Sequence, residues 1–218
     1  MANEKRADRK EDAARAISPE ALIEAKSAII IDCREYIRWS EVLSLSLDGK
    51  VNTLEEARRF AKVLALYQLG YLPVKPGTCP FCIQYSADRS CIGCGYASTH
   101  GGRCDLDSSA FNQFIEAFQE LGRIIYQDNS EPCFDIEGID PECFDIEAAI
   151  QELRRSIDGS SQAAGRLVAD LTDASALRLM EIKAAYLETM LGLMPECLLS
   201  VDARVALDRV REALKRYW

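Results

Sequence analysis

Five cysteines and the only histidine of the chain fall in one Pro- and Gly-rich segment. They are Cys79, Cys82, Cys91, Cys94, His100 and Cys104. The first four form two Cys-x2-Cys pairs separated by eight residues. Thiolates at this spacing can surround a single tetrahedral metal ion. The segment therefore predicts a metal-binding loop over residues 78–105, folded as a short hairpin with two knuckles.

The predicted ligands are Cys79, Cys82, Cys91 and Cys94. Cys-Pro-Phe-Cys at 79–82 and Cys-Ile-Gly-Cys-Gly-Tyr at 91–96 resemble the knuckles of zinc ribbons and rubredoxin-type sites, although the spacer between them is shorter than in those domains. Two glycines, Gly101 and Gly102, could bend the chain so that His100 or Cys104 becomes an additional or alternative ligand. We expect His100 to be a loop histidine that hydrogen-bonds a thiolate or faces solvent, in preference to a direct metal ligand.

Zinc and iron both suit a four-cysteine ligand set, whereas calcium and magnesium prefer oxygen ligands. Four thiolates leave a zinc ion no open position, so the zinc would hold the loop together. An iron-sulfur cluster on the same residues would carry electrons. The two symmetric pairs favour zinc, and the iron-sulfur cluster remains the alternative cofactor.

The composition limits the classes of protein that fit. Of the 218 residues, 48% are apolar and 28% are charged, as in ordinary globular proteins, and the net charge of −9 argues against a general nucleic-acid-binding surface. Neither a signal peptide nor an apolar stretch that could span a membrane is evident. Because the nine cysteines accompany no export signal, we expect a reducing, cytoplasmic compartment, with Cys33 and Cys197 as small core residues.

Helical periodicity predicts an all-α protein of about six helices. Residues 1–17 form a charged N-terminal arm that we expect to be solvated, and helical only when docked. Residues 18–218 form a single helical domain. Ser18-Pro19 begins a helix over residues 19–45 with a stop at Asp48-Gly49, and Thr53 with Glu56 forms a capping box for a helix that ends at Gly70.

The second half of the domain continues this pattern. An amphipathic helix follows Asp107-Ser108, and a short helix is expected from Ile146 to a stop at Asp158-Gly159. A long helical region then runs from residue 160 to residue 191, with a break near Thr172-Asp173, and a last helix begins at Ser200.

An acidic loop over residues 130–147 contains a ten-residue near-repeat, Cys-Phe-Asp-Ile-Glu at 133–137 and again at 143–147. The order of its acids does not match a calcium-binding loop. The loop is instead a candidate surface for a basic partner protein. The candidate partner-binding residues are Asp135, Glu137, Asp140, Glu142 and Asp145.

No catalytic motif accompanies the cysteines, and one histidine leaves no spare imidazole for a Ser-His-Asp arrangement. We therefore favour a non-enzyme: a metal-stapled interaction or adaptor protein, or an accessory subunit of a complex. An iron-sulfur electron-transfer subunit and a zinc-knuckle nucleic-acid-binding protein are the alternatives.

Overall fold

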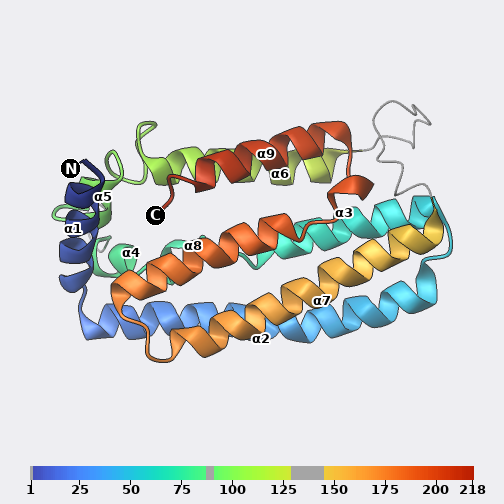
Figure 1. Cartoon of the computed structure of the whole chain (residues 1–218), viewed down its shortest axis with the longest axis horizontal. Coiled ribbons are helices and arrows are strands. Elements are labelled where there is room, and N and C mark those ends of the chain that lie inside the picture. Colours follow the sequence, from blue (N-terminus) through green and yellow to red (C-terminus); the bar gives the residue numbers. More distant parts are fainter. Residues whose placement is uncertain (1, 87–90, 129–144) are drawn as a thin grey trace.

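The computed structural model describes residues 2–86, 91–128 and 145–218, and side chains from Asp8 onward. These residues form an all-α fold without a β-strand (Figure 1). The α-helices are α1 (Ala2–Arg15), α2 (Pro19–Lys50), α3 (Leu54–Gly70), α4 (Pro80–Tyr85), α5 (Gly95–Thr99), α6 (Ala110–Gln127), α7 (Ile146–Leu171), α8 (Ala176–Gly192) and α9 (Val201–Leu214). Two 3-10 helices, η1 (Pro76–Thr78) and η4 (Glu196–Leu198), join them.

Side-chain caps fix several helix starts where the sequence predicts them. Ser18 accepts a hydrogen bond from Ala21 N at 3.2 Å, with Pro19 in the first turn of α2. At α3, Glu56 N donates to Thr53 Oγ1 at 3.2 Å while Thr53 N donates back to the Glu56 carboxylate at 3.1 Å. These bonds satisfy N–H groups that have no partner inside the helix. The predicted capping box is confirmed.

The expected helix stop at Asp158-Gly159 is wrong, because α7 continues through both residues to Leu171. Gly159 serves close packing instead. A Cβ atom on Gly159 would lie 2.8 Å from a methyl carbon of Leu193, so the absent side chain lets the chain after α8 approach α7. The predicted break near Thr172-Asp173 is confirmed, since α7 ends just before it.

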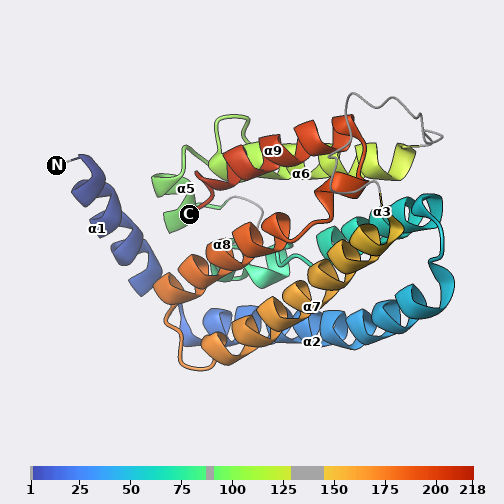
Figure 2. The same cartoon turned by 45° about the vertical axis from the view of Figure 1, so that its right-hand side comes forward.

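The long helices pack as antiparallel or crossing pairs around one core. Helix α2 lies along α7, α6 lies along α9, and α8 and α3 lie between these two pairs (Figures 1 and 2). Apolar side chains that are wholly buried fill the space between the helices, among them Ile29, Leu64, Leu72, Leu121, Leu153 and Ile157. Burial of such side chains is the main stabilising contribution to a fold of this kind.

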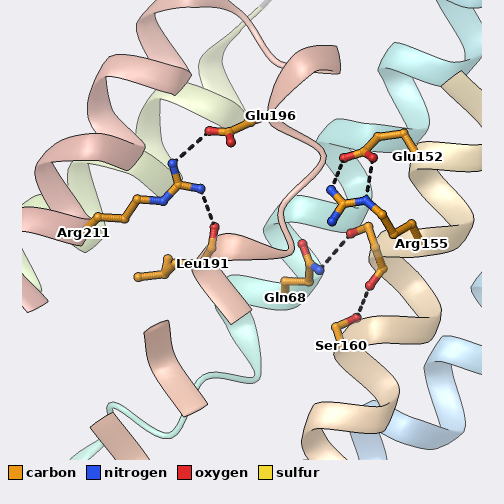
Figure 3. Close-up of polar contacts among 8 residues, drawn as sticks. Gln68, Glu152, Arg155, Ser160, Leu191, Glu196 and Arg211 are labelled. Carbon is orange, nitrogen blue, oxygen red and sulfur yellow. Dashed lines mark hydrogen bonds and ion pairs between the residues drawn. The ribbon is translucent and has the colours of Figure 1, made fainter. Parts of the chain in front are cut away.

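Polar contacts inside the core link helices that are distant in sequence. Tyr36 on α2 donates to Ser160 Oγ on α7 at 2.6 Å, and Gln68 on α3 donates to Ser156 on α7 at 3.1 Å. Near η4, Arg211 donates to the carboxylate of Glu196 and to the carbonyl oxygen of Leu191, both at 2.9 Å (Figure 3). The bonds of Tyr36 and Gln68 satisfy polar groups that would otherwise be costly to bury, whereas Arg211 and Glu196 are partly exposed.

The described residues form nine α-helices, three more than the six or so that the sequence predicts. The N-terminal arm forms α1, which packs against α5 and α8 and buries Ala13 and Ala14. The cysteine-rich segment supplies α4 and α5, so the expected hairpin is not confirmed, and residues 87–90 of the spacer lie outside the described residues. In the described part of the chain, we find no helix that combines the length and the apolarity needed to cross a membrane.

Candidate metal centre

Two short helices position the cysteine pairs. Cys79 immediately precedes Pro80, the first residue of α4, and Cys82 lies within α4. Cys94 immediately precedes α5 in the same way. Each helix therefore begins directly after a cysteine. Short helices, and not a pair of strands, therefore adjoin the two cysteine pairs in the described residues.

Cys79, Cys82 and Cys104 lie together. Hydrogen bonding to Cys104 raises the pKa of the Cys82 thiol to about 12. Hydrogen bonding to Cys82, followed by burial, raises the pKa of Cys79 well above its ordinary value. All three cysteines also act electrostatically on the hydroxyl group of Tyr217, whose pKa is raised chiefly by burial. The structure thus brings Cys104 to the first cysteine pair.

Cys94 borders the same group, since Cys79 acts on it electrostatically, and Cys91 acts on Cys94 as well. Burial raises the pKa of Cys94, while the backbone N–H groups of Ala97 and Tyr96 oppose that rise. Tyr96 is influenced by Cys104, Cys79, Cys82 and Cys94, with burial as the largest cause of its raised pKa. Cys91 acts electrostatically on Cys94, and it is half-buried in a turn with a φ of 51°.

A buried lysine from another helix faces the first pair. Lys183 on α8 is 1% exposed, and its Nζ donates to the carbonyl oxygen of Thr78 at 2.9 Å and to Thr78 Oγ1 at 3.3 Å. Burial lowers the pKa of Lys183, whereas Cys79 and Cys82 raise it. Among the described residues, no carboxylate forms an ion pair with this ammonium group. Lys183 is not among the site residues predicted from the sequence, because no local motif connects it to the cysteines.

His100 lies in an aromatic stack beside the cysteines. Its ring is parallel to that of Tyr96, with centroids 4.1 Å apart, and the indole of Trp218 stacks on it at 5.1 Å. Its Nδ1 lies 2.7 Å from Thr99 Oγ1 and 3.2 Å from the carbonyl oxygen of Tyr96. The described contacts thus give His100 a packing role next to the site.

Within the described residues, no three or more His, Cys, Asp or Glu side chains are grouped closely enough to hold a metal ion. The donor chemistry nevertheless fits a thiophilic metal, because Cys82 interacts with both Cys79 and Cys104, Cys94 acts on the same tyrosine as these three, and the buried Lys183 lies beside the first pair. A metal ion would draw the sulfur atoms nearer to each other than they lie here. The four-cysteine set predicted from the sequence is not confirmed by this geometry.

The acidic loop and the cysteines outside the site are also predicted from the sequence. Asp135, Glu137, Asp140 and Glu142 of the acidic loop lie outside the described residues. Asp145 is described, and its carboxylate accepts a hydrogen bond from Glu147 N at 3.2 Å as the cap of α7. Cys33 is a free, buried core residue as predicted. Cys197 is disulfide-bonded, so the expectation of a free core thiol is wrong there.

No protein-family model, curated protein or solved structure matches the chain. The function is therefore inferred from the site alone.

Proposed function

We propose that Cys79, Cys82, Cys94 and Cys104 bind one structural zinc ion, and that the zinc fastens α4, α5 and the loop after α5 to the end of a helical scaffold. Cys104 replaces Cys91 of the sequence-based ligand set. We prefer Cys104 because it interacts directly with Cys82 of the first pair, whereas the interaction shown for Cys91 is with Cys94 of its own pair.

The observation that carries the proposal is the buried ammonium group of Lys183 beside Cys79 and Cys82. A buried charge without a counter-charge is strongly unfavourable. Four thiolates around a zinc ion carry a net charge of about −2, and Lys183 would offset part of that charge. The cation and the anionic centre would thus stabilise each other.

A zinc ion held by four thiolates has no open position for water or substrate. Its contribution is the folding free energy of the short helices around it, on the order of 10 kcal/mol. We therefore propose that the protein is a scaffold or adaptor for a partner protein, without catalysis of its own, and we prefer this function to that of an enzyme.

The test is elemental analysis with an absorption spectrum, on protein purified without oxygen. About one zinc ion per chain, no visible colour and loss of zinc in Cys82→Ser support the proposal, with Cys33→Ser as the control that retains zinc. Iron with labile sulfide would assign an electron-transfer centre instead, and a metal-free protein would refute the proposal. Affinity purification of the full chain from its own cells, beside Cys82→Ser, tests the adaptor role.

A further inference from the structure

The N-terminal helix packs against the residue that follows the second cysteine pair. Gly95 follows Cys94 and begins α5, and a Cβ atom on Gly95 would lie 2.4 Å from Ala13 Cβ and 2.9 Å from Ala13 Cα. Only a residue without a side chain permits this approach. Helix α1 therefore packs backbone to backbone against the residue that adjoins a proposed ligand.

The connection between α1 and α2 is bound to the first cysteine pair. Gln84 lies on α4, two residues after Cys82. Its Nε2 donates to the carbonyl oxygen of Ala16 at 2.8 Å, and its Oε1 accepts from Ser18 N at 2.6 Å. One side chain of the cysteine-bearing helix thus holds the chain on both sides of residue 17.

A third contact lies at the aromatic stack. Lys10 Nζ on α1 lies 5.0 Å from the centre of the Trp218 ring, and Trp218 in turn stacks on His100. Figures 1 and 2 show α1 at the end of the bundle that carries α4, α5 and the C-terminus. Three separate contacts of α1 and its connection therefore converge on the cysteine-bearing segment.

We propose that metal binding controls the docking of α1, so that this helix is held in the zinc-loaded protein and released when zinc leaves. The inference rests on the proposed zinc site. Helix α4 has 6 residues and α5 has 5, far below the length at which an isolated helix is stable in water. Loss of zinc would unfold both helices and remove two of the three contacts of α1.

Released α1 would also lose its helical structure. It has 14 residues, which is marginal for an isolated helix, and most of its side chains are charged or alanine. The consequence is a metal-dependent switch in residues 2–15, while the long helices of the bundle keep their packing.

Hydrogen exchange measured by mass spectrometry tests the switch on the full chain, with zinc bound and after removal of zinc by a chelator. Peptides from residues 2–15 should be protected with zinc and should exchange like an unstructured chain without it. Peptides from α2 and α7 should stay protected in both states. Equal protection of residues 2–15 in both states would refute the switch and leave the zinc site intact, whereas a chain that never binds zinc would refute both.

A pair of glycine variants separates docking from metal binding. Gly95→Ala should release α1 while one zinc ion per chain is retained, because its new methyl group collides with Ala13. Gly165→Ala on α7 is the matched control, since no atom lies within 4 Å of its added Cβ. Unchanged protection of residues 2–15 in zinc-loaded Gly95→Ala would contradict the proposed contact.

Discussion

Lys183 and Cys79 approach each other from different halves of the chain, and both are buried. The ammonium group is held by the carbonyl oxygen of Thr78, the residue before Cys79, at 2.9 Å. Helix α8 thus places the ammonium group of Lys183 beside the start of the first cysteine pair. This relationship links the helical core to the proposed zinc site.

Replacement of Lys183 by methionine should weaken zinc binding by about 10- to 100-fold, the range seen when groups that support metal ligands are removed. Methionine keeps much of the length of the side chain but leaves the anionic centre without its buried counter-charge. Competition with a zinc-binding dye measures the affinity. Lys75→Met is the control, because Lys75 is exposed and pairs with Asp32 at 3.7 Å on the surface; equal losses in both variants would contradict a specific role for Lys183.

Serine variants of Cys104 and Cys91 should differ in zinc content. Cys104→Ser removes a proposed ligand that interacts with Cys82, so this variant should lose most of its zinc. Cys91→Ser should retain about one zinc ion per chain. Elemental analysis after gel filtration makes the comparison, and the opposite result would restore the ligand set predicted from the sequence.

Cys33 should make the stability of the protein depend on pH in the alkaline range. Burial raises its pKa from 9.0 to about 12 in the folded protein. The folded state therefore holds the thiol proton more tightly than the unfolded state, so this contribution to stability is complete below pH 9 and falls as the pH rises towards 12.

Denaturant unfolding of the wild type and Cys33→Ala at pH 8 and pH 10 measures this effect. The wild type should lose more unfolding free energy between the two pH values than the variant does, and both should keep their zinc at pH 8. Identical losses would show that Cys33 does not titrate as described.

Gly159→Ala should destabilise the protein by about 1–3 kcal/mol, because the added methyl group overlaps Leu193 in a packed region. Gly165→Ala on the same helix has open space and should stabilise α7 by up to about 1 kcal/mol. Thermal unfolding of the two variants should give shifts of opposite sign. A stabilising Gly159→Ala would mean that α8 and its following turn can move away from α7 at little cost.

Local signals explain which parts of the fold could be predicted from the sequence. The capping box of Thr53 and Glu56 and the caps at Ser18 and Ser200 act within one helical turn, and the structure confirms those helix starts. The helix stop predicted at Gly159 is wrong because a glycine that ends a helix and a glycine that allows close packing of a neighbouring side chain look the same in a sequence. Only the position of Leu193 in three dimensions distinguishes them.

In the candidate site too, some features follow from local sequence and others depend on the tertiary structure. The spacing of Cys79 and Cys82 indicates a knuckle by itself, and the structure places both at α4. The choice between Cys91 and Cys104 depends on how the chain folds back after α5, which spacing does not determine. Lys183 comes from a helix more than a hundred residues later, and no sequence pattern connects it to Thr78.

The most direct test of the proposed site is X-ray absorption at the zinc edge on the zinc-loaded protein, with Cys104→Ser measured beside it. We predict four sulfur atoms at about 2.3 Å from one zinc ion in the wild type and a lost or altered sulfur shell in the variant. A zinc shell of nitrogen and oxygen atoms, or no bound zinc at all, would contradict the four-cysteine centre.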